Sequence, residues 1–93
     1  MVSADKEYLY RIRDTLKARR VAMGYKQIEA AARAGITLRS LQHFEQTGKI
    51  SLARLLKLIV VYRMEKKIME GFDDRTSWTL EELERSETRE KVR

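Results

Sequence analysis

Hydrogen-bonding side chains gathered in one short segment give this sequence its clearest chemistry. Apolar Leu41 and Phe44 stand three residues apart, so in a helix they share one face and can anchor it against a core. The remaining faces then carry polar groups outward, where a partner with hydrogen-bonding edges can meet them. The polar residues are Arg39, Ser40, Gln42 and His43.

The same side chains offer little for catalysis. His43 is the single histidine, the chain has no cysteine, and no Asp or Glu stands at a catalytic spacing from the histidine. Asp73 and Asp74 have no companion ligands, which favours a loop over a metal site, and no glycine-rich phosphate-binding loop occurs. We therefore expect no enzyme activity, no cofactor and no bound metal.

Two short helices joined by a tight turn are expected to position the polar segment. The first, over residues 27–33, is rich in Ala and Glu, which are good helix formers. It ends at Gly35, which can adopt the left-handed conformation, and Thr37 offers an oxygen that caps the second helix. The second helix is expected to end at Glu45, with residues 46–49 forming a turn. Such a pair is a helix-turn-helix unit, whose second helix lies in the major groove of DNA.

A long first helix is expected before this unit, over residues 3–23. Ser3 is placed to cap its start and Gly24 to end it. Its buried stripe is predicted to include Leu9, Ile12 and Leu16.

After the unit, Ser51 is expected to cap a fourth helix that is almost entirely apolar. Its inward face is predicted to comprise Leu52, Leu55, Leu56, Ile59 and Val60. Further apolar residues are Leu58, Val61, Tyr62, Met64, Ile68, Met69 and Phe72. One small core does not require so many, so they predict a dimer surface. The alternative is a fifth helix over residues 65–69 that folds back to cover them.

Charge and composition divide the chain into a body and a tail. Residues 1–64 hold 13 Lys/Arg and 5 Asp/Glu, a net charge of +8, whereas residues 65–93 hold 7 and 9, a net charge of −2. The basic body indicates a polyanionic partner. The clearest boundary lies at residues 71–77, so we expect a DNA-binding domain over 1–72 and a tail over 73–93.

A short helix is expected in the tail, because Thr79 and Glu82 match a capping box. Its large apolar residues are Trp78, Leu80 and Leu83, and tryptophan is frequent among interface anchors. These three residues either bind a partner or fold back onto the domain.

The remaining totals predict a cytoplasmic protein. The absence of cysteine fits a reducing compartment. No apolar run approaches the roughly 18 residues of a membrane span, and the N-terminus lacks the basic-then-apolar pattern of a secretory signal.

Across residues 8–63 the chain resembles the Cro/phage-repressor (XRE) class of bacterial helix-turn-helix regulators. The matching residues are Gly24-x-x-Gln27, Ala31, Ala34-Gly35-Ile36-Thr37, Leu41, Phe44-Glu45 and the leucine-rich helix after Ser51. The resemblance implies an all-α, five-helix, lambda-repressor-like domain with a short C-terminal tail or helix. More narrowly, SLQHFEQTGKISLARLLKL and the tail TSWTLEELERSETREKVR are similar to HipB-like antitoxins, which are encoded beside Hip-type kinase toxins.

The resemblance also implies roles for individual residues. In this class, the first positions of the recognition helix and one position a turn later contact base edges. Arg39 suits the O6 and N7 atoms of guanine, and Leu38 suits the methyl group of thymine. The implied base contacts are Leu38, Arg39, Gln42 and His43. The implied DNA-backbone contacts are Lys26, Gln27, Thr37, Ser40 and Lys49.

Two further residues correspond to positions that are buried in members of this class. Arg20 and Glu45 correspond to an ion pair that bridges the first and third helices, so we expect both to be structural. The chain departs from the class at Lys26, where Ser or Thr commonly caps the second helix; a missing side-chain cap costs about 1 kcal/mol.

The expected function is a homodimeric repressor that binds a pseudo-palindromic operator in double-stranded DNA, within the bacterial cytoplasm and nucleoid. The narrowest expectation is the antitoxin of a Hip-type operon, which binds its own promoter and its kinase toxin. One alternative is a phage-type or stand-alone XRE regulator. The other is a protein-interaction module that no longer reads DNA, which the tail and the surplus apolar residues favour.

Overall fold

A computed structural model describes residues 3–92, and it contains helices and connecting turns with no strand in that range. The predicted all-α class is confirmed. No helix among the described residues is both long and apolar enough to cross a membrane. The helices are α1 (Ala4–Ala22), α2 (Gln27–Ala34), α3 (Leu38–Thr47), α4 (Leu52–Val61), α5 (Glu65–Asp73) and α6 (Leu80–Val92).

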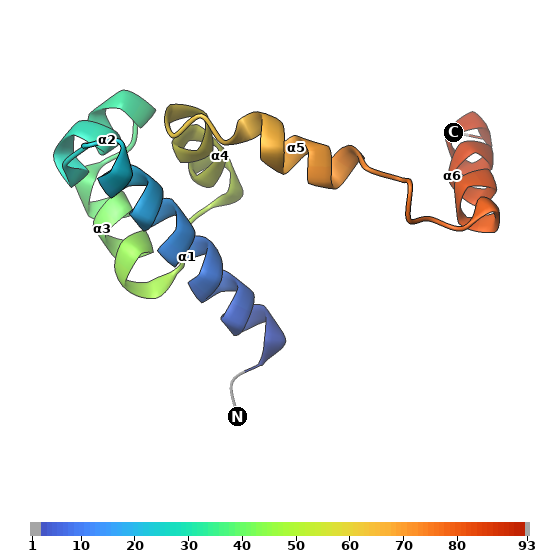
Figure 1. Cartoon of the computed structure of the whole chain (residues 1–93), viewed down its shortest axis with the longest axis horizontal. Coiled ribbons are helices and arrows are strands. Elements are labelled where there is room, and N and C mark those ends of the chain that lie inside the picture. Colours follow the sequence, from blue (N-terminus) through green and yellow to red (C-terminus); the bar gives the residue numbers. More distant parts are fainter. Residues whose placement is uncertain (1–2, 93) are drawn as a thin grey trace.

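Helices α1 to α4 pack into one body, in which α2 contacts both α3 and α4, and α1 lies against α3 (Figure 1). Ala30 and Ala31 are fully buried where α2 meets its neighbours, because their small side chains allow the helices to approach closely. The buried apolar side chains are Leu16, Ala30, Ala31, Ala34, Leu41, Phe44, Leu58, Ile59 and Tyr62.

Helix α1 differs from its prediction at its first half. Leu16 is buried as expected, but Leu9 and Ile12 remain 39% and 41% exposed because this half projects beyond the other helices (Figure 1). Ser3 occupies the predicted N-cap position, but its side chain makes no capping hydrogen bond. At the other end, Gly24 has φ +78, which lets the chain turn as predicted.

Helix α3 is two residues longer than the segment predicted for it, which ended at Glu45. The hydroxyl of Thr47 donates to the carbonyl oxygen of His43 at 2.7 Å, and the turn follows at Gly48, where φ is +79. The expected cap is present at the start, where the Thr37 hydroxyl oxygen accepts from the Ser40 N–H at 3.0 Å.

Helix α4 begins at the predicted cap, where the Ser51 hydroxyl oxygen accepts from the Arg54 N–H at 3.2 Å. Its inward face is rotated relative to the prediction. The buried residues of the helix and its cap are Leu58, Ile59 and Tyr62, and Leu55 and Val61 are half-buried. The prediction that Leu58 and Tyr62 belong to a dimer surface is therefore wrong, because both side chains fill the core of the single chain. The residues left exposed are Leu52, Leu56 and Val60, which the prediction had placed inside. The position of α2 decides which face of α4 is turned towards the core. The leucine-rich sequence of α4 is compatible with several such orientations.

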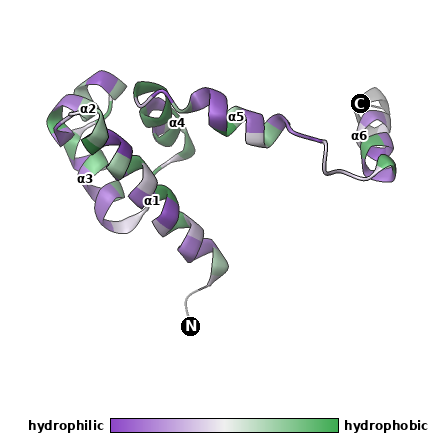
Figure 2. Ribbon diagram, viewed as in Figure 1, coloured by the Kyte–Doolittle hydropathy of each residue, from purple (hydrophilic) through white to green (hydrophobic). Residues whose placement is uncertain are grey.

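The fifth helix, α5, is present but extends away from the body (Figure 1), so the alternative in which it folds back to cover α4 is not observed. It follows Arg63, which has φ +58, a left-handed conformation that ends α4 and redirects the chain. Met64 and Ile68 are half-buried against the core, whereas Phe72 is 78% exposed. Figure 2 shows the apolar character concentrated on α4, beside the mixed surface of α5.

Helix α6 is separated from the body by the linker 74–79 and makes no substantial contact with the other helices (Figure 1). The predicted capping box is present: the Glu82 N–H donates to the Thr79 hydroxyl at 3.1 Å, and the Thr79 N–H donates to the Glu82 carboxylate at 3.2 Å. Within the linker, the Asp74 carboxylate accepts hydrogen bonds from the N–H and hydroxyl of Thr76, which lower the pKa of Asp74.

Candidate DNA-binding surface

The outward face of α3 is polar and solvent-exposed along its whole length. Arg39, Gln42 and His43 are exposed, as the sequence predicted for groups that meet a partner. Leu38 and Ser40 are half-buried at the two edges of this face. The arrangement presents several hydrogen-bonding side chains on one convex helix, which is the shape that fits a major groove.

The opposite face of α3 fixes the helix to the body. Leu41 is fully buried and Phe44 is 1% exposed, and both belong to the core shared with α2 and α4. Because these anchors and the Thr37 cap determine how α3 lies, the exposed side chains project from a rigid element.

A buried ion pair adds a second constraint. The Arg20 Nε donates to Glu45 Oε2 at 2.8 Å and the Arg20 Nη2 donates to Oε1 at 3.0 Å, with both residues 8% exposed. Arg20 also donates to the carbonyl oxygen of Tyr25 at 2.8 Å. The hydrogen bonds with Glu45 raise the pKa of Arg20 above its usual value, against the opposing effect of burial. The pair joins α1, α3 and the turn before α2.

Gln27 connects this ion pair with the exposed surface. Its Nε2 donates to Glu45 Oε1 at 2.9 Å, and its Oε1 lies 3.5 Å from the Gln42 Nε2, which donates to it. The half-buried Gln27 therefore links Gln42, a residue expected to contact bases, to the buried ion pair. The sequence placed both residues in the site without predicting this link between them.

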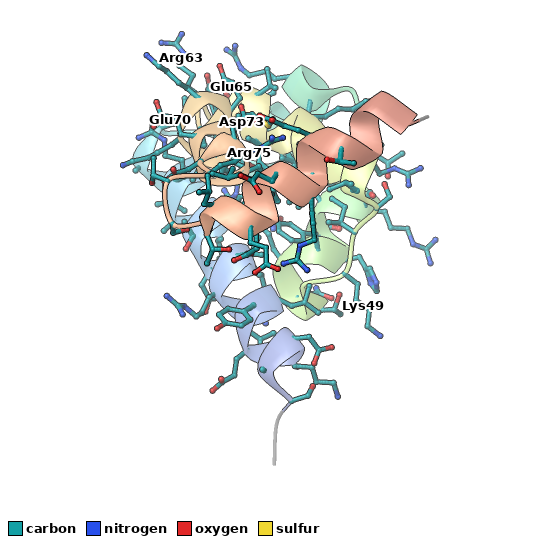
Figure 3. The ribbon with its side chains drawn as sticks, turned by 90° about the vertical axis from the view of Figure 1, so that its right-hand side faces the viewer. Lys49, Arg63, Glu65, Glu70, Asp73 and Arg75 are labelled. Carbon is teal, nitrogen blue, oxygen red and sulfur yellow. The ribbon has the colours of Figure 1, made fainter. Side chains whose placement is uncertain are left out.

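The residues expected at the DNA backbone lie around the same face. Lys26 and Thr37 are exposed at the N-termini of α2 and α3. Lys49 follows α3, and Figure 3 shows its side chain at the edge of the molecule, pointing away from the ribbon. The absence of a side-chain cap at Lys26 is offset in part, because the Glu29 carboxylate accepts from the Lys26 N–H at 3.2 Å.

Gln46 is an outward-facing residue that the sequence analysis missed. It is exposed and lies seven residues after Arg39, two helical turns further along the same face. Its carbonyl oxygen accepts from the Arg13 Nη1 at 3.4 Å, which joins the end of α3 to α1. The prediction ended the helix at Glu45 and so assigned Gln46 to a turn; the helical spacing from Arg39 was the available signal.

The three tail residues expected to bind a partner do not join this surface. Trp78 and Leu80 are 40% and 73% exposed, and Leu83 is half-buried on α6. The Arg75 guanidinium lies over the Trp78 ring, 5.2 Å from its centroid. Helix α6 lies far from α3 (Figure 1), so these residues are not part of the exposed polar face of α3.

A short glycine turn between two packed helices, followed by a second helix with an exposed polar face, defines a helix-turn-helix DNA-binding protein. Comparison with family models agrees: the model described as Helix-turn-helix matches residues 16–66, which include the whole of α2, α3 and α4. The chain belongs to this family, the XRE-type helix-turn-helix, and is by class a DNA-binding regulator of transcription with the expected lambda-repressor-like fold. No match was found among curated proteins or among solved structures.

Proposed function

We propose that this protein is a sequence-specific transcriptional repressor that binds a pseudo-palindromic operator as a homodimer in the bacterial cytoplasm, at the nucleoid. The observation that carries the proposal is the exposed face of α3, held in place by buried Leu41 and Phe44 and by the Arg20–Glu45 ion pair. Two copies of this helix would enter successive major grooves about 34–36 Å apart.

Within the groove, base recognition belongs to four side chains. Arg39 donates two hydrogen bonds to a guanine, Leu38 contacts a thymine methyl group, and Gln42 and His43 complete the contacts. The exposure of Arg39 and His43 and the hydrogen bond that orients Gln42 support this assignment.

Contacts with phosphates position the helix without reading sequence. Lys26 and Lys49 supply charge, and the N-termini of α2 and α3 supply N–H groups near Gln27, Thr37 and Ser40. The exposure of both lysines beside α3 supports this division of roles.

Comparison of two alanine variants tests the proposal. Arg39→Ala is expected to lower the preference for the operator over random DNA by about 1–3 kcal/mol, because one base pair loses its readout. Lys49→Ala is expected to weaken both DNAs alike, because it removes only a phosphate contact. Both affinities are measured by gel shift on an operator selected from a random pool.

Loss of operator and random-DNA binding in the same proportion by Arg39→Ala would rule out base readout by this residue. Absence of any DNA affinity at low salt in the unsubstituted protein would favour the alternative of a protein-interaction module that keeps the fold.

A second, narrower candidate is the antitoxin of a Hip-type operon, and α6 is the feature that favours it. Trp78 in the linker and Leu80 on α6 are exposed on an arm that stands apart from the DNA-binding body, where a kinase toxin would bind them. A Hip-type kinase gene beside this gene, whose product co-purifies with the full chain but not with a Trp78→Ala, Leu80→Ala variant, supports the antitoxin. Without such a gene the protein is a phage-type or stand-alone XRE regulator.

A further inference from the structure

The chain exposes more surface than a compact monomer of its mass. Its accessible area is 7621 Å² for 11.0 kDa, whereas folded monomers of this mass expose about 5600 Å². Its radius of gyration is 16.7 Å, compared with about 12 Å for a compact domain of this length. The excess of about 2000 Å² exceeds the roughly 800 Å² that each partner buries in a standard interface.

Part of this surface is an open groove between α2 and α4, with a volume of about 340 Å³. Its floor is apolar, and Leu56 and Val60 in it are 43% and 57% exposed. Arg33 and Lys57 add positive charge at the groove. The full lining is Arg33, Ala34, Leu56, Lys57, Val60 and Val61.

Helix α6 has the complementary pattern. Leu80 and Leu83 stand three residues apart on one face, and Glu84 and Glu87 follow at four and seven residues from Leu80, along the same side. The capping box secures the start of the helix without help from the body. A helix of 13 residues is marginal alone, however, so burial of its apolar stripe would stabilise it considerably.

We propose that α6 of one copy docks in the α2–α4 groove of a second copy, and that the exchange is reciprocal. Leu80 and Leu83 lie against the apolar floor, and Glu84 and Glu87 face Arg33 and Lys57. The proposal deepens the homodimer proposed above and rests on it.

The course of the chain favours docking of α6 in the groove of the second copy over docking in the groove of its own chain. Helix α5 carries the linker away from its own groove (Figure 1), and a six-residue linker spans at most about 20 Å when extended. The Asp74–Thr76 hydrogen bonds shorten that reach further. In a dimer, the same projection leaves α6 free to reach the neighbouring copy.

Matched charge reversals in the full-length protein test the exchange. The tail variant carries Glu84→Lys and Glu87→Lys; the groove variant carries Arg33→Glu and Lys57→Glu. Each is expected to weaken self-association by about 100-fold or more, because like charges then face one another. An equimolar mixture is expected to restore the dimer, because both of its reciprocal contacts pair opposite charges. Sedimentation equilibrium without DNA measures all three samples.

Control variants are Glu81→Lys, on another face of α6, and Lys6→Glu, at the far end of α1; both are expected to remain dimeric. Circular dichroism melting checks the fold of the groove variant, because the Arg33 guanidinium lies over the Tyr25 ring at 4.7 Å.

Each outcome decides the proposal. Monomeric variants whose mixture dimerises support exchange. If both variants and their mixture are monomeric, the two charge pairs do not meet across copies and exchange is overturned. If both variants stay dimeric, the copies associate elsewhere, so exchange is overturned while the homodimer stands and α6 is free for a toxin. If the unsubstituted protein is itself monomeric, both the exchange of α6 and the homodimer are overturned.

A second measurement avoids charge reversal altogether. Because the chain has no cysteine, a Val60→Cys variant and a Leu83→Cys variant can be mixed and treated with a short bismaleimide. Exchange predicts a covalent heterodimer as the main product, and its absence contradicts the proposed docking. Neither measurement uses DNA, so failure of base readout by α3 would not affect either result.

Discussion

Tyr62 combines almost complete burial with a hydroxyl that has no hydrogen-bond partner among the described residues. The side chain is 1% exposed at the end of α4. Burial raises the pKa of this hydroxyl to about 12, and the negative charge of Glu45 acts in the same direction, while Arg20 opposes it. The aromatic ring therefore fills the core at the cost of a desolvated polar group.

This environment predicts a loss of stability at alkaline pH. The folded pKa of Tyr62 is raised, so its contribution is fully present below the unfolded value of about 10 and is lost as pH rises towards 12. Between pH 9 and pH 11.5, the titration of Tyr62 lowers the free energy of unfolding by about 2 kcal/mol. The Tyr62→Phe variant should not show this alkaline loss of stability. At neutral pH it should be at least as stable as the unsubstituted protein, because the desolvated hydroxyl is gone.

Urea unfolding of both proteins at several pH values measures the difference, since other titrating groups are common to the two. Parallel curves of free energy against pH would show that Tyr62 titrates normally and is hydrated in the fold.

Among single residues, type and spacing in the sequence were sufficient to find the exposed polar residues of α3. The buried anchors Leu41 and Phe44 imply an outward face, and Arg39 and His43 are on it. The hydrogen bond between Gln27 and Gln42 was not predictable, because it joins residues of two helices whose relative placement depends on the whole core.

At the scale of helices, Glu45 is the junction of the DNA-binding unit. Its carboxylate accepts from Arg20 on α1 and from Gln27 on α2, while its own backbone belongs to α3. Three helices therefore share one buried charged group, and the orientation of α3 depends on it.

Glu45→Ala should lower the free energy of unfolding by about 3–5 kcal/mol, because the buried guanidinium of Arg20 would lose its partner. Urea unfolding with far-UV circular dichroism measures the change. Glu29→Ala is the matched control: that carboxylate is exposed and accepts only a capping hydrogen bond, so its loss should cost about 1 kcal/mol. A similar small loss in both variants would mean that the ion pair contributes little.

Helix boundaries followed from the sequence where a local signal decides them. The caps at Thr37, Ser51 and Thr79 involve groups within three residues, and the hydrogen bonds form as predicted. The inward face of α4 did not follow, because leucine, isoleucine and valine occur around most of the helix. Its rotation depends on where α2 lies, which local sequence does not specify.

At the scale of the whole molecule, a basic DNA-binding body is joined to an extended, acidic C-terminal arm. The body carries α3, and α5 and the linker hold α6 away from it (Figure 1). The capping box and the boundary at residues 71–77 allowed the sequence to predict a separate helix in the arm. The position of that helix could not be predicted, because nothing in the sequence of the arm fixes the direction in which α5 leaves α4.

The proposed dimer makes a quantitative prediction about salt dependence. Each phosphate contact contributes about −0.9 to the slope of the logarithm of affinity against the logarithm of salt concentration. If Lys49 contacts one phosphate per protomer, Lys49→Ala should reduce the magnitude of this slope by about 2 on a full operator, because a dimer loses two contacts. On a duplex with a single half-site, which engages one protomer, the reduction should be about 1.

Fluorescence anisotropy across a salt series measures both slopes. Lys67→Ala on α5, a helix that extends away from the body (Figure 1), is the control with no expected change. The comparison of the two duplexes separates two questions. An unchanged slope on both duplexes would exclude Lys49 as a phosphate contact. A reduction of about 1 on both would keep the contact and contradict a dimer on the operator, because only one copy of the residue would then meet the DNA.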